Sequence, residues 1–289
     1  MSTPSRSRPL EIRPDTELFR APVVAMLMPH YGPVEFGACQ AFLMAPLHNR
    51  FVQVCLQAAR TTSLLPYTFN MLLCDALDAR DHGVRDPDGE LVHATHMAML
   101  HADIQPYALN WLDLLYAEMH KSGADLVSAV VPIKSPDGDT STAVGKVSDP
   151  WHHRRLSAVE ADALPTTFGT TDVNGGDPDA FLMANTGCFL ADLRRPYWHD
   201  FAFGFQTRVF KDEAGHWKTQ IRPEDWEMSR HLHLAGAKVC VTSRVPLMHL
   251  GGGEWPNHAT LRLFASRASQ AANENPESTP VVASLEAVA

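Results

Sequence analysis

The chain has 289 residues, of which 45% are hydrophobic and 20% charged, and this globular composition excludes collagen-like, coiled-coil and disordered chains. Such a length corresponds to one large domain or two closely packed ones. The formal net charge of −9 argues against binding nucleic acid or an anionic membrane through overall charge, and no apolar run reaches the roughly 18 residues of a membrane helix.

The two ends of the chain are polar and rich in proline or small residues. Residues 1–20 lack the apolar core of a signal peptide and indicate a flexible N-terminal arm, and residues 266–289 indicate a disordered tail. The five cysteines include no Cys-x-x-Cys pair, which predicts free thiols in a reducing compartment and argues against a cysteine zinc site. We therefore expect a cytoplasmic protein.

Strand and helix signals alternate along the first half of the chain. Strands are predicted at 22–28, 51–56, 97–100 and 126–131. One helix carries Phe69, Leu72 and Leu73 on one face, with Asn70 expected near its start as a cap, and a second helix over 109–119 is closed by Gly123. This alternation is typical of an α/β fold with a mostly parallel central sheet flanked by helices.

The second half is expected to contain long loops. Residues 135–150 and 165–178 are rich in Gly, Pro, Ser, Thr and Asp, a composition that predicts irregular structure. A strand at 187–190, a hairpin over 203–217 that turns at 212–215, a helix over 224–234 and a last strand at 239–241 are predicted to follow.

The strand at 97–100 ends in His101, Ala102 and Asp103. Ligands of parallel α/β sheets bind beyond the carboxyl ends of the strands, and residues i and i+2 at a strand end point the same way. His101 and Asp103 are therefore expected to aim at one point, where an imidazole and a carboxylate suit Mn²⁺ or Mg²⁺ bridging a diphosphate. The alternative is a hydrogen-bonded pair at the strand end, with Asp103 as a helix cap.

Three further strings offer chemistry. Glu224 and Asp225 are adjacent at a predicted helix start, where a carboxylate either accepts a proton from a hydroxyl group or simply caps the helix. His249 follows a short strand and precedes a glycine run, so it is either a metal ligand or a structural histidine. The basic run 152–155 is either a solvated surface or an attractor of an anionic acceptor or of donor phosphates.

Taken in order, these strings resemble the nucleotide-sugar glycosyltransferases of the GT-A fold, family 2 in particular, over about residues 22–253. Asp103 matches the second aspartate of the family's Asp-x-Asp motif, and His101 replaces the first. Glu224 and Asp225 match the acid pair, and His249 matches the metal-binding histidine. Further matches are the opening strand with its Pro-x-Tyr turn, an Asn before the second helix and the small-residue strand of the sugar pocket, at Pro29, Tyr31, Asn70, Asn185 and Gly187.

The resemblance implies a hexosyltransferase-like enzyme that moves a sugar from a UDP- or GDP-sugar to an acceptor hydroxyl. It implies Mn²⁺ or Mg²⁺ held by Asp103, His249 and His101, and an inverting reaction with Asp225 or Glu224 as the base. It implies one domain over 21–265, with a nucleotide-sugar half at 21–134 and an acceptor half at 135–265. The residues implied to contact the donor are Pro29, Tyr31, Asn70, His101, Ala102, Asp103, Asn185 and Gly187.

The acceptor stays open: a glycan, a lipid-linked sugar, a protein, a small molecule or a modified base. A homo-oligomer is left open as well. The alternatives are a catalytically inactive nucleotide-sugar or glycan-binding module, which the histidine at position 101 favours, and a metal-dependent hydrolase that uses some of the 15 histidines. His-Glu-x-x-His, Gly-x-Ser-x-Gly, Gly-x-Gly-x-x-Gly and P-loop strings are absent, which argues against zincins, α/β-hydrolases, dinucleotide-binding dehydrogenases and Walker-type NTPases.

Overall fold

The structure is a computed structural model that describes residues 21–251 and 253–274. The predicted arm at 1–20 and residues 275–289 of the predicted tail lie outside the described residues. Among the described residues, no helix combines the length and the apolar character needed to cross a bilayer.

The elements in chain order are β1 (Val23–His30), α1 (Phe36–His48), β2 (Gln53–Thr61), α2 (Leu65–Asp81), β3 (Val84–Arg85), β4 (Leu91–Val92), β5 (His96–Leu100), β6 (Ile104–Pro106), α3 (Trp111–Ser122), β7 (Leu126–Ala129), β8 (Asp139–Lys146), β9 (His153–Ser157), α4 (Ala158–Ala163), β10 (Thr167–Gly169), α5 (Thr170–Val173), β11 (Ala180–Met183), β12 (Cys188–Asp192), the 3₁₀ helix η2 (Pro196–Trp198), β13 (Gln206–Lys211), β14 (Trp217–Arg222), α6 (Glu224–Leu234), β15 (Val239–Thr242), β16 (Leu247–Leu250), β17 (Glu254–Pro256) and α7 (His258–Glu274).

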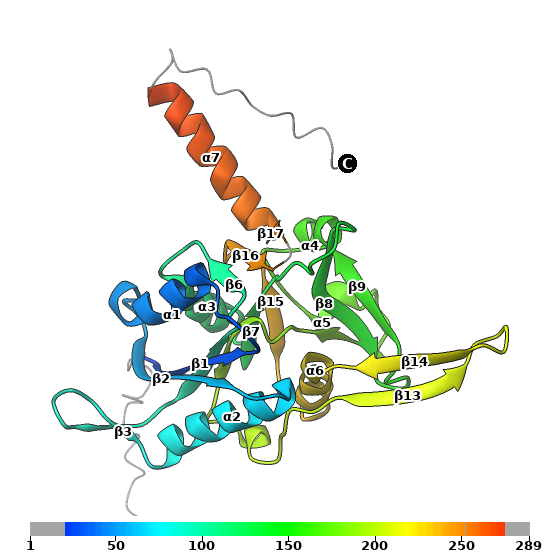
Figure 1. Cartoon of the computed structure of the whole chain (residues 1–289), viewed down its shortest axis with the longest axis horizontal. Helices are drawn as coiled ribbons and strands as arrows, with labels where there is room; N and C mark the ends of the chain where they lie inside the picture. Colours follow the sequence, from blue (N-terminus) through cyan, green and yellow to red (C-terminus); the bar gives the residue numbers. More distant parts are fainter. Residues whose placement is uncertain (1–20, 252, 275–289) are drawn as a thin grey trace, which may run out of the picture.

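A seven-stranded sheet forms the centre of the molecule, in the order β10–β15–β7–β12–β5–β1–β2 (Figure 1). Strands β2, β1 and β5 are parallel to one another, as are β15 and β7, and β12 runs antiparallel to both β5 and β7. Five of the seven strands therefore point the same way, and β12 and the edge strand β10 point the other way. The predicted α/β fold with a mostly parallel central sheet is confirmed.

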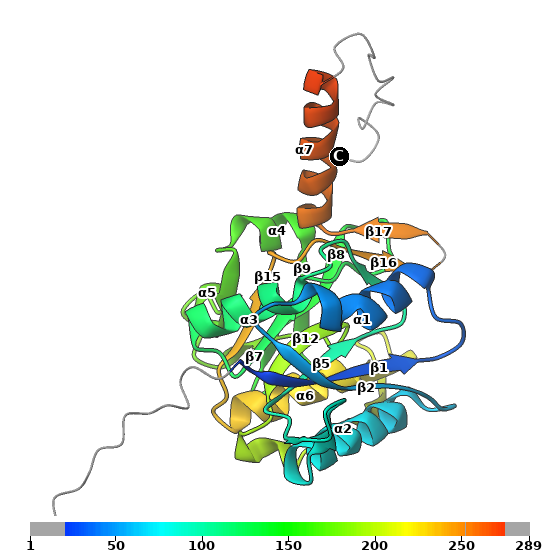
Figure 2. The same ribbon diagram turned by 90° about the vertical axis from the view of Figure 1, so that its left-hand side faces the viewer.

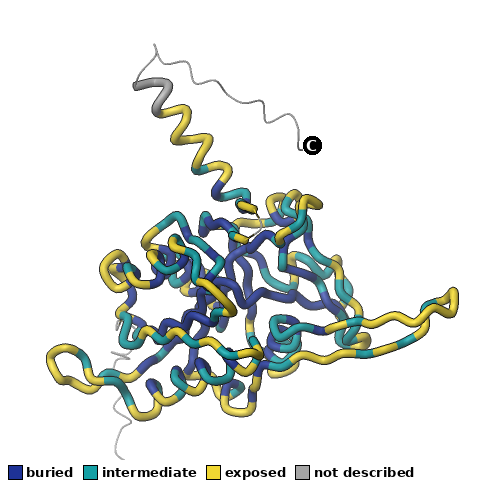
Figure 3. Tube along the Cα trace, in the orientation of Figure 1, coloured by how far each residue is buried: buried dark blue, intermediate teal, exposed yellow. Residues whose placement is uncertain are grey.

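Helices cover both faces of this sheet. Figure 2 shows α2 on one side and α1 and α3 on the other. Along β1, Ala25 and Leu27 pack into the core with α2, whereas Val24 and Met26 pack into the core with α1 and α3. A strand buried on both faces appears in the sequence as a continuous apolar run, which is why β1 is easy to predict. The buried residues concentrate in this central layer, whereas the β13–β14 hairpin and α7 are mostly exposed (Figure 3).

Most predicted elements of the first half are confirmed, and several are longer than predicted. Helix α2 buries Phe69, Leu72 and Leu73 as expected. It begins at Leu65, so Asn70 lies in its second turn, and the prediction that Asn70 caps the helix is wrong. Gly123 ends α3 in the left-handed conformation, with φ of 65°, as a C-terminal glycine does. Helix α6 has the predicted bounds.

The two predicted long loops contain regular structure, which corrects that expectation. Strand β8 lies within 135–150, and β10 and α5 lie within 165–178. The inward positions of β8 include Thr140, Thr142 and Gly145, so the strand shows no apolar alternation. Thr140 satisfies its hydroxyl by donating to the carbonyl of Leu156 (2.8 Å). A buried strand made of small and polar residues is therefore hidden from a hydrophobicity pattern.

Regular structure also continues past the predicted last strand. Strand β15 is followed by β16, β17 and α7, and His249 lies inside β16 rather than after a strand. Helix α7 projects from the body of the molecule (Figure 1) and includes residues 266–274, where the sequence predicts a disordered tail.

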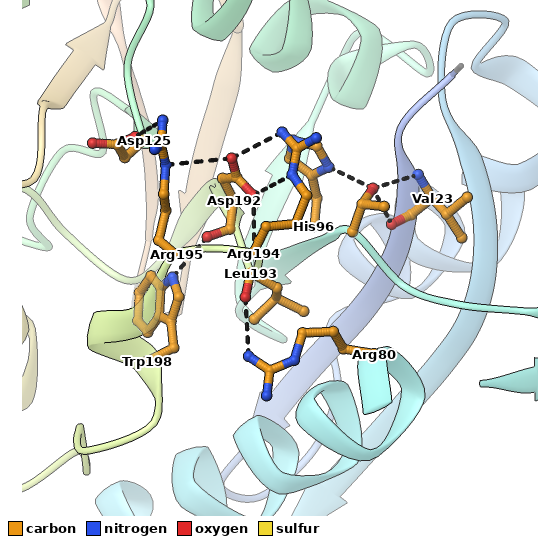
Figure 4. Close-up of polar contacts among 10 residues, drawn as sticks. Val23, Arg80, His96, Asp125, Asp192, Leu193, Arg194, Arg195 and Trp198 are labelled. Carbon is orange, nitrogen blue, oxygen red and sulfur yellow. Dashed lines mark hydrogen bonds and ion pairs between the residues drawn. The ribbon is translucent and has the colours of Figure 1, made fainter. Parts of the chain in front are cut away.

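A polar network around the buried residues His96 and Asp192 fixes the amino-terminal end of β5 (Figure 4). The ring nitrogen Nδ1 of His96 lies 2.8 Å from the hydroxyl of Thr95, which also accepts a hydrogen bond from the backbone N–H of Val23. Opposite His96 in β12, Asp192 forms an ion pair with Arg194 (2.8 Å). Burial lowers the pKa of His96 to about 4, so the ring is neutral at pH 7. The network connects the three adjacent strands β1, β5 and β12 at the amino-terminal end of β5.

Candidate functional site

The candidate site lies beyond the carboxyl end of β5, where the strand gives way to a turn. The backbone N–H of His101 donates a hydrogen bond to the carbonyl of Gly187 (2.8 Å). The N–H of Ile104 donates a hydrogen bond to the carbonyl of His101 (3.1 Å). This closes a tight turn around Asp103. Strand β6 then pairs antiparallel with β16, and His249 stands opposite Ile104. The pairing brings Asp103 and His249 together, although 146 positions separate them in the sequence.

Two side chains meet the carboxylate of Asp103. Its Oδ2 atom accepts a hydrogen bond from Nζ of Lys134 (2.6 Å) and lies 3.2 Å from Nε2 of His249. Burial alone would raise the pKa of Asp103, but the hydrogen bonds from His249 and Lys134 outweigh it and hold the pKa well below its usual value. Asp103 is therefore ionised at neutral pH, and the ammonium of Lys134 is its closest positive charge.

The ring of His249 is oriented through its other nitrogen. Nδ1 lies 2.7 Å from the carbonyl oxygen of Pro132. Because a carbonyl oxygen only accepts hydrogen bonds, Nδ1 carries a proton. The hydrogen bond from Nε2 to Asp103 therefore forms when Nε2 also carries a proton, as in the imidazolium. A backbone carbonyl that fixes one ring nitrogen leaves the other nitrogen aimed at the site.

His101 lies close enough to Asp103 for the charges of the two groups to interact. Its ring packs against Phe69 of α2, with ring centroids 5.2 Å apart. Its Nε2 atom is buried without a hydrogen-bond partner, and burial lowers the pKa of His101 to about 4, so the ring is neutral at pH 7. Strand β5 ends at Leu100 and Asp103 lies in the turn, so the alternation that predicts a common direction for the two side chains does not reach Asp103.

The arrangement does not fit the divalent cation that the resemblance implies. Among the residues that the structure describes, no group of three or more His, Cys, Asp and Glu side chains could hold a metal ion. Asp103 and His249 converge, but the ammonium of Lys134 already bonds to the carboxylate oxygen that a metal would take, and His101 packs against Phe69. Binding of Mn²⁺ or Mg²⁺ stays a prediction.

A pair of carboxylates stands at the start of α6. Glu224 and Asp225 are its first two residues. Burial, reinforced by the charge of Glu224, raises the pKa of Asp225 to about 7, although the backbone N–H of Trp226 (2.9 Å) and the charge of Arg155 act the other way. Burial also raises the pKa of Glu224. A carboxylate with a pKa near 7 is suited to take up a proton at neutral pH.

The segment 184–187 connects the acid pair of α6 with the turn that carries Asp103. Ser229 of α6 accepts a hydrogen bond from the backbone N–H of Ala184 (2.9 Å) and lies 2.8 Å from the carbonyl oxygen of Asp225. At the other end of the segment, the carbonyl of Gly187 accepts the hydrogen bond from His101. A short stretch of hydrogen-bonded backbone thus links the start of α6 to the turn that carries Asp103.

Asn185 and Gly187 shape this segment from within. The side chain of Asn185 donates to the carbonyl of Ala129 (2.7 Å) and accepts from the N–H of Gly187 (2.9 Å). A Cβ atom at position 187 would lie 3.2 Å from Oδ1 of Asn185, so glycine allows this close approach. Both were predicted to line a sugar pocket, and the structure shows their role in holding the backbone of the segment.

Three other predicted donor contacts lie at the same end of the sheet. Pro29 is buried near the carboxyl end of β1, which runs parallel to β5, and Tyr31 follows it with 73% of its surface exposed. The carbonyl of Ala102 accepts a hydrogen bond from the N–H of Glu35 (2.9 Å), which fixes the turn beside Asp103. The exposed ring of Tyr31 is the one of these that a ligand can reach directly.

Asn70 acts on the site from a distance. Its amide nitrogen donates to the carbonyl of Phe203 (2.8 Å), and its amide oxygen accepts from the N–H of the same residue (2.7 Å). Phe203 packs against Phe69, which in turn packs against His101. Asn70 therefore anchors Phe203, which packs against the phenylalanine in contact with His101.

The basic run 152–155 packs beside the acid pair. The rings of His153 and Trp226 lie 3.9 Å apart, and the guanidinium of Arg155 lies 5.3 Å from the centre of the Trp226 ring. Arg154 instead forms an ion pair with Glu160 (2.6 Å). Part of the run thus belongs to the surroundings of Asp225 rather than to open solvated surface.

Lys134 is a site residue that the sequence patterns above do not single out. It follows β7 in the chain, and β7 points the same way as β5 because both pair antiparallel with β12. A lysine just beyond the carboxyl end of a buried strand was the signal that could have identified it, since such ends meet at one edge of the sheet.

No protein-family model matches the chain, and no curated protein matches its sequence. Among solved structures, the chain is similar to a CMP:2-keto-3-deoxy-manno-octonic acid synthetase in complex with CTP, at 10% identity and a TM-score of 0.36, over 87% of this chain and 99% of that one. It is also similar to a provisionally assigned UDP-N-acetylglucosamine pyrophosphorylase from Entamoeba histolytica, at 9% identity and a TM-score of 0.33, over 78% of this chain and 74% of that one. Similarity at this level carries no functional argument, so the assignment of function depends on the residues of the site.

Proposed function

We propose that the protein is a glycosyltransferase of the GT-A type, which transfers a sugar from a UDP- or GDP-sugar to a hydroxyl group of an acceptor. The observation that carries this proposal is the joint presence of two chemistries at one end of the sheet. Asp225 has a pKa near 7, and the charged cluster of Asp103, Lys134 and His249 lies at the other end of the segment 184–187. Sugar transfer needs a base for the hydroxyl and a charged site for the departing diphosphate.

In this reaction, Asp225 removes the proton of the acceptor hydroxyl as its oxygen attacks the anomeric carbon. The bond between that carbon and the diphosphate oxygen breaks, and the nucleoside diphosphate leaves with the electron pair. The attack comes from the face opposite the leaving group, so the configuration is inverted. A positioned base contributes roughly 10²- to 10⁴-fold to such a rate. Glu224 lies beside Asp225 and is the alternative base, because burial raises its pKa as well.

The unpartnered nitrogen of His101 also supports ligand binding at the end of β5. A buried polar atom without a hydrogen bond costs on the order of 1–3 kcal/mol. The Nε2 atom of His101 is such an atom among the described residues. A hydroxyl group of a bound sugar would supply the missing partner.

The test is release of nucleoside diphosphate from a panel of UDP- and GDP-sugars, with water and with glycan, protein and small-molecule hydroxyl acceptors. Wild-type protein should release the diphosphate, and Asp225→Asn should bind the same donor but release it at least about 100-fold more slowly. Glu213→Gln, at an exposed carboxylate in the β13–β14 turn, is the matched control. If no donor binds and none releases its diphosphate, the proposal is overturned. If a donor binds but releases no diphosphate with any of the acceptors, the result favours a non-catalytic nucleotide-sugar-binding module.

A further inference from the structure

The ammonium group of Lys134 is held in a defined position beside Asp103. Its Nζ atom lies 2.6 Å from Oδ2 of Asp103. On another side it lies against Gly251, where a Cβ atom would come within 2.8 Å of Nζ. Gly251 also has φ of 112°, which side chains other than glycine rarely adopt. Glycine at this position leaves room for the ammonium at the end of β16.

The carboxylate of Asp103 already has a cation bonded to it. The ammonium of Lys134 lies 2.6 Å from Oδ2 of Asp103, and Nε2 of His249 lies 3.2 Å from the same oxygen. A divalent ion on Oδ2 would displace the ammonium or stand directly beside it, and two positive charges in contact repel each other. A diphosphate group, by contrast, brings negative oxygens that an ammonium binds well as a point charge.

From this arrangement we propose that Lys134 itself supplies the positive charge that binds the donor's diphosphate, in the role that the family resemblance gives to a divalent cation. The inference rests on the proposed function. Asp103 is then a positioning residue: it holds the ammonium at the carboxyl end of β5 until the diphosphate arrives. The diphosphate oxygens contact Nζ, and the charge that grows on the leaving group is stabilised by a fixed side chain.

Calorimetric titration with UDP, GDP, uridine and guanosine tests this inference, with chelator present and with Mn²⁺ present. Wild-type protein should bind UDP or GDP with the same affinity in both conditions. Lys134→Met should weaken that affinity on the order of 10- to 100-fold, as expected for a lost hydrogen bond to a charged group. Its affinity for the matching nucleoside should not change, because a nucleoside has no phosphate, and Lys134→Arg should recover part of the lost affinity. A structural role for Lys134 would not separate the two ligands in this way.

Lys146→Met is the matched control, since Lys146 also forms an ion pair with an aspartate, Asp177 (3.2 Å), at similar exposure: 39% and 40% of the side chains, against 35% and 36% for Lys134 and Asp103. Binding of UDP or GDP that requires Mn²⁺ and disappears with chelator would overturn the inference and leave the glycosyltransferase proposal intact. Unchanged affinity in Lys134→Met would do the same. If wild-type protein binds neither diphosphate, both proposals fail. The chelator comparison uses wild-type protein, so it holds even if a variant does not fold.

Discussion

Replacing Asp225 with asparagine should stabilise the protein while it removes the proposed base. The pKa of Asp225 is raised from 3.8 to about 7, mainly by burial, so the folded state disfavours its ionised form. Each pKa unit corresponds to about 1.4 kcal/mol, and a shift of about three units sets an upper limit of about 4 kcal/mol for the cost of this charge. Asparagine has nearly the same shape and no charge, so we expect a gain of about 2–4 kcal/mol in the free energy of unfolding at pH 8.

The gain should depend on pH with a definite sign. Between pH 3.8 and about 7 the folded protein keeps a proton on Asp225 that the unfolded chain releases. The carboxyl group therefore costs more stability as the pH rises through this window, and the cost is constant above it. Relative to wild type, Asp225→Asn should gain little near pH 4 and most above pH 7.

Urea unfolding followed by tryptophan fluorescence at pH 5 and pH 8 measures this difference, because Trp226 adjoins the substituted residue. Glu213→Gln, on the exposed hairpin turn, should leave the free energy of unfolding nearly unchanged at both pH 5 and pH 8. Burial of the Asp225 charge does not destabilise the protein if Asp225→Asn is no more stable than wild type at pH 8, or if its stability advantage does not grow between pH 5 and pH 8.

Three other predictions concern Asp225, Asn70 and His96. Release of nucleoside diphosphate should rise with pH to a plateau above about 7, since Asp225 must be ionised to act as a base; a flat profile between pH 5 and 8 would exclude it from that role. Asn70→Ala removes both hydrogen bonds to Phe203 and should lower the free energy of unfolding by about 1–3 kcal/mol in urea unfolding, whereas a loss below about 0.5 kcal/mol would show that these bonds contribute little. The pKa of His96 is lowered from 6.5 to about 4 in the folded state, so between these pH values the unfolded chain is protonated at His96 and the folded protein is not. The free energy of unfolding should therefore fall by roughly 1–3 kcal/mol as the pH falls from 6.5 to 4. His96→Gln should reduce that loss, and an unchanged acid dependence in this variant would contradict the assignment.

The helices and strands that could be predicted are those whose buried faces leave a regular pattern of apolar residues in the sequence. Strand β1 is apolar because α1, α2 and α3 cover it from both sides, and α2 and α6 show their helical faces or acidic starts directly. Strand β8 could not be predicted in this way, because Gly145 must leave room for Met183, whose sulfur would lie 2.7 Å from a Cβ at that position. Close approach between strands selects small residues there, and such residues also occur in loops.

The site was predictable in its separate parts but not in its assembly. Asp103, His249 and Asp225 each stand at an informative place in the sequence, and the structure brings Asp103 and His249 into contact. The predicted partnership of His101 with Asp103 depended on strand alternation, which stops at Leu100. Lys134 reaches Asp103 only because β7 and β5 end at the same edge of the sheet, a relation that depends on strand order.

We expect a nucleoside diphosphate to bind beyond the carboxyl end of β5. The most direct test is a crystal structure of the wild-type protein soaked with UDP and, separately, with GDP. We predict that the diphosphate of one of them lies within hydrogen-bond distance of Nζ of Lys134, beside the turn of Asp103. A diphosphate bound elsewhere on the protein, with the surroundings of Lys134 and Asp103 unchanged, would contradict the account.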